Sequence, residues 1–486
     1  MTARPLPSGR ILPQRVAILG FARSGRALAS ALLDRGIEVA IGDRAPESAF
    51  EGLDELRARG ARLFFGGPAE GFLDGAGWLA LSPGVPLSAG AVAEARSRGI
   101  PVSGELELAW EIAEAEVEGT NRWVAITGTN GKSTTTAWIA DILRRSGRPV
   151  ALAGNIGVPL SAFLSERAPR DFVCEVSSFQ LDTVEWFAPD VAVLTNVTPD
   201  HLDRYADFTE YAASKERVFA RQAPGDFSVV NADDPIAFAA ATRGRRVPFS
   251  RAGEAPGGAW LESGSIFSDV SGGPRRVLAA DELSLPGAHN VENALAALGA
   301  AECLGVPPDA IRGGLTGFQG LPHRTELVAE AGGVRWVNDS KGTNVDATKK
   351  SLEGCAPASV ILILGGRDKH GDFSALLPLV KRAARRVLTV GEAAPVIETA
   401  FGDAVASERA GTMDRAVARA AEIARPGDTV LLSPACASFD QYSNFEERGE
   451  HFAALARRMA GTIGGRGEAA AGRGSGNGKP ETGKKS

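Results

Sequence analysis

The chain has 486 residues, which at about 100 to 200 residues per domain suggests about three domains. Its 53 lysines and arginines against 59 aspartates and glutamates give a net charge of −6, so no basic excess points to a general nucleic-acid binder. Hydrophobic residues at 44% and charged residues at 23% are ordinary globular usage and exclude a chain that is disordered throughout.

Neither a membrane span nor an export leader is expected. Residues 1–15 contain basic residues and prolines without an apolar stretch, and no run reaches the about 18 apolar residues that a span needs. The 4 cysteines are far apart and form no C-x-x-C pair. We therefore expect buried, reduced thiols in a cytoplasmic protein.

The first domain is predicted over residues 1–110. Residues 15–43 read as a strand, a glycine turn, a helix and a second strand, with the sequences RVAILG, GFARSGRALASALLDRG and IEVAIGD. Such a crossover implies a parallel, Rossmann-like sheet with a ligand crevice at the carboxyl ends of its strands. The glycine turn lacks the middle glycine of a dinucleotide fingerprint, so it is weak evidence for NAD.

The second domain, residues 111–320, begins with the strand RWVAIT and a glycine-rich loop that runs into an amphipathic helix. The N–H groups of such a loop and helix start form an anion site, where Lys132 would reach phosphates and Ser133 would bind Mg²⁺. A strict P-loop has a glycine where this chain has Ile126, so the loop is a variant, and an accidental glycine turn is the alternative. The predicted phosphate-binding residues are Gly128, Thr129, Asn130, Gly131, Lys132, Ser133 and Thr134.

Two further residues of this domain are candidate metal ligands. Glu175 ends the apolar strand DFVCE, where a carboxylate without a partner is costly to bury, although a Glu turned to solvent is an alternative. His201 follows the apolar strand VAVLTNV, and a capping or core histidine is equally consistent with that position. Because no zinc-type spacing occurs, Mg²⁺ suits the site better than zinc.

The remainder of the chain predicts three more segments. Short runs broken by glycines between Pro248 and Pro286 predict a small antiparallel sheet within the second domain. Strands and helices then alternate over residues 321–462, which predicts a third, Rossmann-like α/β domain. Residues 463–486 are glycine-rich and are expected to be a disordered tail.

Taken in order, the motifs of residues 15–459 resemble the Mur ligase superfamily. They are GTNGKST, EVSSFQLD, TNVTPDHLDRY, YAASKERV, LPGAHNVENALAA, GLPHRTE, NDSKGTNVDAT, GGRDKHGDF and SPACASFDQYSNFEERGEHF. The resemblance implies an ATP-dependent amide ligase of peptidoglycan precursor synthesis, whose three domains bind a uridine nucleotide, ATP and an amino acid. The last motif is most similar to members that add D-glutamate to UDP-N-acetylmuramoyl-L-alanine through an acyl phosphate.

The resemblance also implies roles for individual residues. It makes Ser133, Glu175, His201 and a carbamylated Lys215 the ligands of two Mg²⁺ ions, and Lys132, His201, Lys215 and Lys341 the catalytic residues. For ATP it adds Asn290, Asn293, Arg324 and Asp339. For the uridine substrate and the acceptor amino acid it adds Ser24, Asp43, Arg44, Ser82, Asn155, Ser177, Thr343, Lys369, Ser438 and Phe445. Without the resemblance, Lys215 reads as an ordinary surface lysine of a helix.

Three other interpretations remain open at this point. A regulatory protein that binds ATP without ligase chemistry would explain the glycine loop but not the combination of Lys215, His201 and Lys369. An NAD-dependent dehydrogenase would rest on residues 16–43 alone. A different ligase of the same superfamily would differ in substrate. We expect a monomer.

Overall fold

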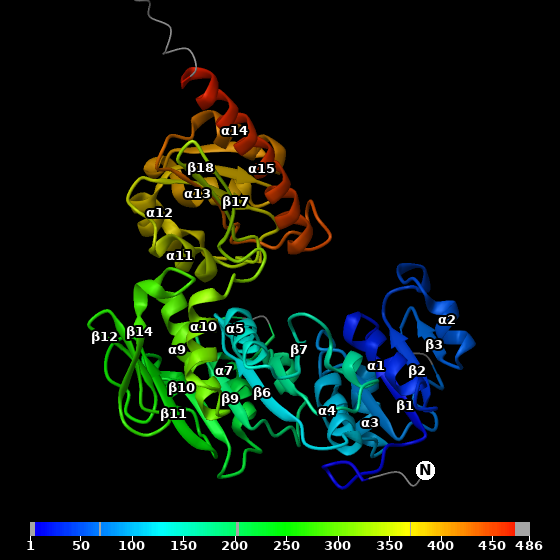
Figure 1. Ribbon diagram of the computed structural model, residues 1–486. Coiled ribbons are helices and arrows are strands. Elements are labelled where there is room, and N and C mark those ends of the chain that lie inside the picture. The colour runs from blue at the N-terminus through cyan, green and yellow to red at the C-terminus, as the bar shows by residue number, and fades with distance from the viewer. Residues whose placement is uncertain (1–4, 68–69, 201–203, 370, 472–486) are drawn as a thin grey trace, which may run out of the picture. The chain divides into compact units, whose positions relative to one another are not determined.

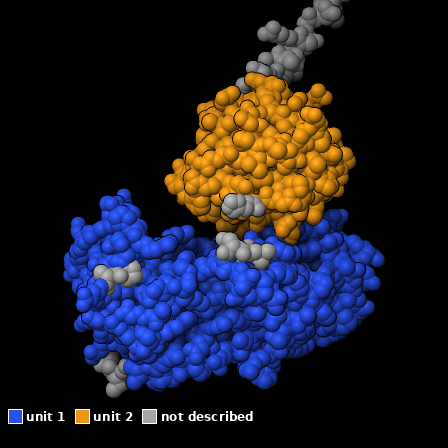
Figure 2. Space-filling model, turned by 180° about the vertical axis from the view of Figure 1, so that it is seen from behind, with its two compact units in different colours: residues 1–319 blue, residues 320–486 orange. Residues whose placement is uncertain are grey.

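The computed structural model describes residues 5–67, 70–200, 204–369 and 371–471. The chain separates into two compact units, residues 1–319 and 320–486 (Figure 2). The first unit contains two sheets and the second contains one, each flanked by helices (Figure 1). The α/β fold class expected from the sequence is confirmed. In the described ranges, the helices are too short or too polar to cross a bilayer.

The first sheet is entirely parallel, with the strand order β3-β2-β1-β4-β5. Its order reverses at the central strand β1, so the loops after β1 and β4 border a crevice at the carboxyl ends of these strands. Its strands and adjoining helices are β1 Arg15–Leu19, α1 Arg23–Leu33, β2 Glu38–Asp43, α2 Leu53–Ala58, β3 Arg62–Phe65, β4 Trp78–Leu81, α3 Gly90–Ser97, β5 Val102–Gly104 and α4 Glu105–Glu116.

The second sheet has nine strands in the order β14-β13-β12-β11-β10-β9-β6-β8-β7. The strands from β7 to β12 are parallel, and β13 and β14 are antiparallel additions, so the predicted small antiparallel segment continues the main sheet. The strands are β6 Arg122–Thr127, β7 Val150–Gly154, β8 Asp171–Glu175, β9 Val191–Leu194, β10 Phe227–Asn231, β11 Arg245–Ser250, β12 Ala259–Glu262, β13 Ser265–Ser268 and β14 Arg275–Ala279. The helices are α5 Lys132–Arg145, α6 Ser178–Leu181, α7 Phe208–Glu216, α8 Pro235–Ala239, α9 Ala288–Cys303 and α10 Pro308–Gly317.

One buried hydrophobic cluster runs through both sheets of the first unit. It includes Val16 and Leu28 from the first sheet and its helix α1, and Trp123 and Phe172 from the second sheet. The Trp123 and Phe172 rings stack with centroids 4.2 Å apart. Because the apolar faces share one core, the first two sequence domains form a single compact unit.

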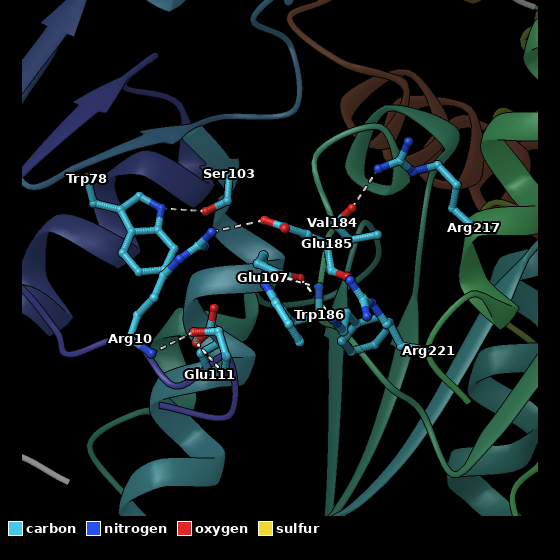
Figure 3. Close-up of polar contacts among 12 residues, drawn as sticks. Arg10, Trp78, Ser103, Glu107, Glu111, Val184, Glu185, Trp186, Arg217 and Arg221 are labelled. Carbon is cyan, nitrogen blue, oxygen red and sulfur yellow. Dashed lines mark hydrogen bonds and ion pairs between the residues drawn. The ribbon is translucent and has the colours of Figure 1, made fainter. Parts of the chain in front are cut away.

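Helix α4 joins the two sheets through buried carboxylates that accept backbone hydrogen bonds. Glu105 Oε1 accepts from Ser161 N at 2.7 Å. Glu107 accepts from Trp186 N at 2.7 Å and from Phe187 N at 3.0 Å, on the loop that follows α6 (Figure 3). Burial raises the pKa of Glu107 to about 7. The acidic helix α4 is therefore an internal joint between the two sheets.

The sheet of the second unit has the order β15-β16-β20-β17-β18-β19, in which β15 alone among these strands is antiparallel to its neighbour. Its helices pack on both faces, with α14 and α15 over one buried cluster and α11 to α13 over the other. The elements are β15 Glu326–Ala331, β16 Val334–Asn338, α11 Val345–Glu353, β17 Val360–Gly365, α12 Leu377–Ala383, β18 Ala384–Val390, α13 Ala394–Phe401, β19 Ser407–Gly411, α14 Met413–Ile423, β20 Thr429–Leu432 and α15 Phe445–Ala471.

Helix α15 differs from the sequence expectation at its end. It includes residues 463–471, which the composition assigns to a disordered tail. The first half of the helix packs on the core through Phe452 and Leu455, and a formed helix adds residues more easily than a new one starts. The alanines 469–471 favour the helix, whereas the glycines before them do not.

Candidate active site

The first unit contains a cavity of about 680 Å³ at the crevice of the first sheet. The loops after β1, β2 and β4 line one side, and the loop after β7 and helix α6 of the second sheet line the other. Both sheets of the unit therefore contribute walls. Among the lining residues are the predicted substrate-binding residues Ser24, Asp43, Arg44, Ser82 and Asn155.

The turn from β1 into α1 is packed too closely for a side chain at Gly20, where a Cβ would lie 2.8 Å from Val85 Cγ2, or at Gly25. A Cβ on Gly25 would lie 2.1 Å from the Gly20 carbonyl oxygen. Asp43 accepts hydrogen bonds from Phe21 N at 2.7 Å and Ala45 N at 2.9 Å, and Ser82 Oγ donates to Gly20 O at 2.7 Å. Asp43 and Ser82 thus shape the cavity wall as well as lining it.

The cavity is suited to an anionic group. The N-terminal turns of α1 and α3 both border it, through Arg23 and Ser24 on α1 and through Gly90 and Ala91 on α3. A helix N-terminus presents backbone N–H groups and a partial positive charge. The exposed side chain of Arg44 adds a full positive charge at the same cavity. This arrangement can bind a diphosphate.

The glycine loop after β6 has the backbone conformation of an anion-binding turn. Gly128 and Gly131 have φ values of 142° and 83°, which favour glycine. Lys132 begins helix α5, and its Nζ donates to the carbonyl oxygens of Gly128 at 3.0 Å and Thr129 at 2.9 Å. The lysine therefore lies over the loop at the helix N-terminus.

A chain of hydrogen bonds connects this loop to the cavity. Ser133 Oγ donates to Glu175 Oε2, and Asn155 Nδ2 donates to Glu175 Oε1 at 2.8 Å. Asn155 also lines the cavity. The hydroxyl of Ser133 and the carboxylate of Glu175 are hard oxygen donors that fit Mg²⁺. His201, the other predicted ligand, lies outside the described residues.

Lys215 is buried beside the same loop. It lies on α7 with 2% of its surface exposed, its Nζ donates to Gly128 O at 2.8 Å, and it lies 4.4 Å from the centre of the Tyr211 ring. Burial, and then the positive charge of Lys132, lower the pKa of the Lys215 ammonium well below its ordinary value. Lys215 is therefore not the surface lysine that its helix context alone suggests.

Asn290 and Asn293 lie at the start of α9, next to the glycine loop. Both are 7% exposed, and Asn293 Nδ2 donates to Asn290 Oδ1 at 3.3 Å. Thr135 Oγ1 donates to Asn293 Oδ1 at 3.3 Å, and a Cβ on Gly131 would lie 2.4 Å from that oxygen. Ser177, by contrast, is the N-cap of α6, where its Oγ accepts from Gln180 N at 3.2 Å.

Four predicted residues lie near β16 in sequence or at the start of α15. Arg324 precedes β15, Asp339 and Lys341 follow β16, and Phe445 begins α15. Asp339 follows β16 and accepts hydrogen bonds from Ser351 Oγ at 2.6 Å and Ser433 Oγ at 2.7 Å. Burial raises its pKa, and the nearby Arg324 opposes this effect. Two residues further on, Lys341 places its Nζ 3.8 Å from the centre of the Phe445 ring.

The remaining predicted residues follow neighbouring strands of the same sheet. Thr343 follows β16, Ser438 follows β20 and Lys369 follows β17, and these three strands are adjacent and parallel. Arg367 and Ala437 form a bridge between the last two loops. The topology therefore brings the three residues to one edge of the sheet, where Lys369 is exposed and Ser438 is 2% exposed.

Three family models together match most of the chain. The Mur ligase MurD-like N-terminal domain matches residues 14–104, the Mur ligase middle domain matches 126–301, and the Mur ligase glutamate ligase domain matches 323–436. A protein named UDP-N-acetylmuramoylalanine–D-glutamate ligase from Pelotomaculum thermopropionicum is 44% identical over 445 residues, which cover 90% of this chain and 96% of the relative. The chain belongs to the Mur ligase family.

Other relatives and solved structures agree with this. A protein of the same name from Anaeromyxobacter dehalogenans is 45% identical, and the match covers 92% of this Mur ligase and 98% of the relative. The structure of UDP-N-acetylmuramate-alanine ligase from Thermotoga maritima has a TM-score of 0.58 at 18% identity, covering 91% and 99% of the two chains. MurF ligase from the same organism, in complex with ADP, has a TM-score of 0.58 at 16% identity, covering 87% and 95%. At these identities the structures support the fold.

Sequence reasoning missed three residues of this Mur ligase that contact the site. Gln180 lines the cavity and completes a capping box with Ser177, which the spacing S-x-x-Q signals. Asn196 bonds the glycine loop from the neighbouring strand β9. Arg448 is 2% exposed and donates to carbonyl oxygens of the loops after β16 and β20. No local pattern distinguishes Asn196 or Arg448 from ordinary polar residues.

Proposed function

We propose that this chain joins D-glutamate to UDP-N-acetylmuramoyl-L-alanine, with hydrolysis of ATP to ADP and phosphate, in peptidoglycan precursor synthesis. The relatives that share about 40% or more of its residues carry the name of this activity. The observation that carries the proposal is the series Asn155, Glu175 and Ser133, which connects a cavity for an anionic ligand to a phosphate-binding loop within one unit.

The chemistry requires activation of a carboxylate. A carboxylate is a poor acyl donor, so the L-alanyl carboxylate oxygen attacks the γ-phosphorus of ATP and ADP leaves, which gives an acyl phosphate. The amine of D-glutamate then attacks the acyl carbon, loses a proton, and phosphate leaves. Positioning and neutralisation of phosphate charge are the main demands of the first step. Lys132 at the start of α5 supplies a positive charge there.

The geometry of the first unit supports our proposal for the substrate sites. We assign the uridine diphosphate group to the cavity of the first sheet, where two helix N-termini and Arg44 favour an anion. Asn155 lies at the side of the cavity that adjoins Glu175, which is where the L-alanyl carboxylate needs to lie to meet the γ-phosphate. Asn290 and Asn293, beside Gly131, would contact the adenosine part of ATP.

Two Mg²⁺ ions would be held by Ser133 and Glu175, and by His201 and a carbamylated Lys215. When bound, Mg²⁺ neutralises charge on the phosphate oxygens. Only a neutral amine adds CO₂: the Lys215 Nζ would form a bond to the carbon and lose a proton, which gives an anionic carbamate. The burial of Lys215 and the lowered pKa of its ammonium favour that neutral amine.

The second unit would bind the acceptor amino acid and complete the ATP site. We propose that Arg324, Asp339 and Lys341 serve ATP, and that Thr343, Lys369, Ser438 and Phe445 surround D-glutamate. A lysine with hydroxyl groups suits recognition of a carboxylate. We further propose domain limits of 1–110, 111–320 and 321–462, a cytoplasmic location and a monomer.

The first test is phosphate release from Mg²⁺-ATP with UDP-N-acetylmuramoyl-L-alanine and, in separate reactions, D-glutamate, L-glutamate, L-alanine or meso-diaminopimelate. We expect release and a new amide with D-glutamate alone. Turnover with another amino acid would assign the chain to a sister ligase. ATP binding without turnover would favour a regulatory protein instead.

The carbamate is tested with Lys215→Ala, with the exposed Lys381→Ala as the control. Removal of a ligand-bearing side chain at a phosphoryl-transfer site is expected to lower kcat by about 10²-fold or more. A short-chain carboxylic acid should partly restore the activity of Lys215→Ala and leave Lys381→Ala unchanged. Failure of every acid to restore activity would contradict the carbamate while leaving the ligase assignment intact.

A further inference from the structure

Asn196 contacts both backbone groups of one residue in the phosphate-binding loop. It follows β9, and its Oδ1 accepts a hydrogen bond from Asn130 N at 2.9 Å while its Nδ2 donates to Asn130 O at 3.1 Å. Its own backbone carbonyl accepts a third bond, from Thr129 N at 2.8 Å. Asn196 therefore provides hydrogen-bond partners for backbone groups of two consecutive loop residues, Thr129 and Asn130, just before helix α5 begins.

The neighbouring Thr195 adds a second donor to the same carbonyl. Thr195 Oγ1 donates to Asn130 O at 2.6 Å, and its side chain is 3% exposed. A Cβ on Gly128 would lie 2.0 Å from Thr195 Oγ1, so only a glycine at position 128 leaves room for this hydroxyl. The Asn130 carbonyl thus has two side-chain donors from the strand beside the loop.

The Thr195–Val197 segment is itself fixed by the next strand of the sheet. Asn231, at the end of β10, donates from Nδ2 to Thr195 O at 2.8 Å. Asp234 accepts from Val197 N at 2.9 Å. Hydrogen bonds from the end of β10 and from the N-cap of α8 therefore fix the Thr195–Val197 segment, so Asn196 acts from a fixed position.

These bonds determine which backbone groups of the loop face an anion. A carbonyl oxygen directed at phosphate repels it, whereas N–H groups attract it. With the Asn130 carbonyl held by Thr195 and Asn196, Gly131 takes its left-handed φ of 83° and the chain continues into α5. The first N–H groups of a helix have no acceptor within that helix and are directed outward, toward an anion.

We propose that Asn196 is a positioning residue for ATP: it holds the phosphate-binding loop in its anion-binding conformation before the nucleotide arrives. The inference rests on the proposed use of ATP. If Asn196 is replaced, the loop spends part of its time in other conformations. The apparent affinity for ATP then falls in proportion to the fraction of molecules whose loop is in the binding-competent conformation. At saturating ATP the bound nucleotide restores the loop, so kcat changes much less than KM.

The test compares Asn196→Ala with Asn121→Ala. Asn121 is also a buried asparagine with both amide groups bonded, to Glu114 and to Arg170 N, but it lies away from the loop. For each protein we would measure the dissociation constant of a non-hydrolysable ATP analogue with Mg²⁺, the KM for ATP and for both other substrates, kcat, and the melting temperature. Thr195→Val, which removes one donor to the Asn130 carbonyl at nearly constant volume, is a second variant in case Asn196→Ala does not fold.

For Asn196→Ala we expect the analogue dissociation constant and the ATP KM to rise together by about tenfold, with kcat within about twofold and the other KM values unchanged. Thr195→Val should shift in the same direction by less, and Asn121→Ala should lower only the melting temperature. Equal analogue affinity in Asn196→Ala and Asn121→Ala would overturn the inference, as would a fall in kcat at constant KM. Failure of the unaltered protein to bind the analogue would instead contradict the proposed function.

Discussion

The first unit contains two glycine loops with the same local plan and different surroundings. Each follows a central parallel strand at a point where the strand order reverses, and each runs into a helix. The loop at residues 20–24 opens onto a cavity of about 680 Å³. The loop at residues 128–133 instead receives hydrogen bonds from Lys132, Lys215 and Asn196.

The difference shows what turns a glycine loop into one kind of site or the other. The conformation of the first loop is set by hydrogen bonds with Asp43, which ends the neighbouring strand β2, and with Ser82, which follows the neighbouring strand β4. The second has two lysine amines within bonding distance of one carbonyl, that of Gly128, and Lys132 brings a positive charge to the start of α5. The space at the first loop suits the nucleotide sugar that we propose there, and the charge at the second suits the proposed transferable phosphate.

The largest expected effect comes from removing the charge that distinguishes the second loop. Lys132→Ala should lower kcat/KM for ATP by about 10³-fold, because Lys132 places a positive charge over the loop at the start of α5. The KM for the uridine substrate should change little. Steady-state kinetics with Lys381→Ala as the control check this. Parallel losses for both substrates would show that the two loops do not act separately.

A pair of glycine variants tests the separation with smaller effects. Gly131→Ala brings a Cβ within 2.4 Å of Asn293 Oδ1 at a positive φ, and Gly25→Ala brings one within 2.1 Å of Gly20 O. Strain of about 1–3 kcal/mol at each loop corresponds to about a tenfold or larger rise in one KM. We expect Gly131→Ala to affect ATP and Gly25→Ala the uridine substrate.

The matched control for this pair is Gly313→Ala in α10, where a Cβ meets no atom within 4 Å. Both KM values should stay at their original level in this variant. If Gly25→Ala and Gly131→Ala raise the same KM, the assignment of one substrate to each loop is wrong.

The smallest expected effect on activity comes from the joint between the two sheets that carry the loops, where the change is one of stability. Burial, and to a lesser degree the charge of Glu111, raise the pKa of Glu107 from 4.5 to about 7, against the effect of its backbone N–H donors. Because the folded state holds the proton more tightly, the stabilising contribution of Glu107 is complete below pH 4.5 and is lost as the pH rises to about 7. The difference amounts to about 3 kcal/mol of unfolding free energy.

Urea unfolding at pH 5 and pH 8 measures this contribution. Glu107→Gln should lose less stability between the two pH values than the unaltered protein does. Glu118→Gln, which changes an exposed carboxylate next to α4, should keep the full pH dependence. An equal pH dependence in all three proteins would place the ionisation of Glu107 outside the range that its burial implies.

The sequence predicts most of the fold because the buried parallel strands are continuous apolar runs. The strands at Val16 and Trp123 are predicted from such runs. The edge strands β15 and β19 were missed, since ELVAEA and SERAG alternate or lack apolar residues and are only half buried. Edge strands have one neighbour and one exposed side, so they carry a weaker pattern.

The residues of the candidate site also divide into those that a local sequence pattern predicts and those that only the packing reveals. The sequence predicts Lys132 and Ser133 because a loop between a strand and a helix has a local signature. The burial of Lys215 has no such signature: its helix pattern is that of a surface position, and only the packing of α7 against the glycine loop makes it internal. Asn196 was missed for the same reason, because its partners are 66 residues away in the chain.

The buried Arg448 has a consequence for how the second unit is synthesised. Its guanidinium reaches Ser340, which lies 108 residues earlier, and the carbonyls of Cys436 and Ala437. These loops therefore remain without this support until Arg448, on helix α15, has left the ribosome. Segments made early in a chain can begin to fold during translation, whereas this edge of the sheet waits for a residue made much later.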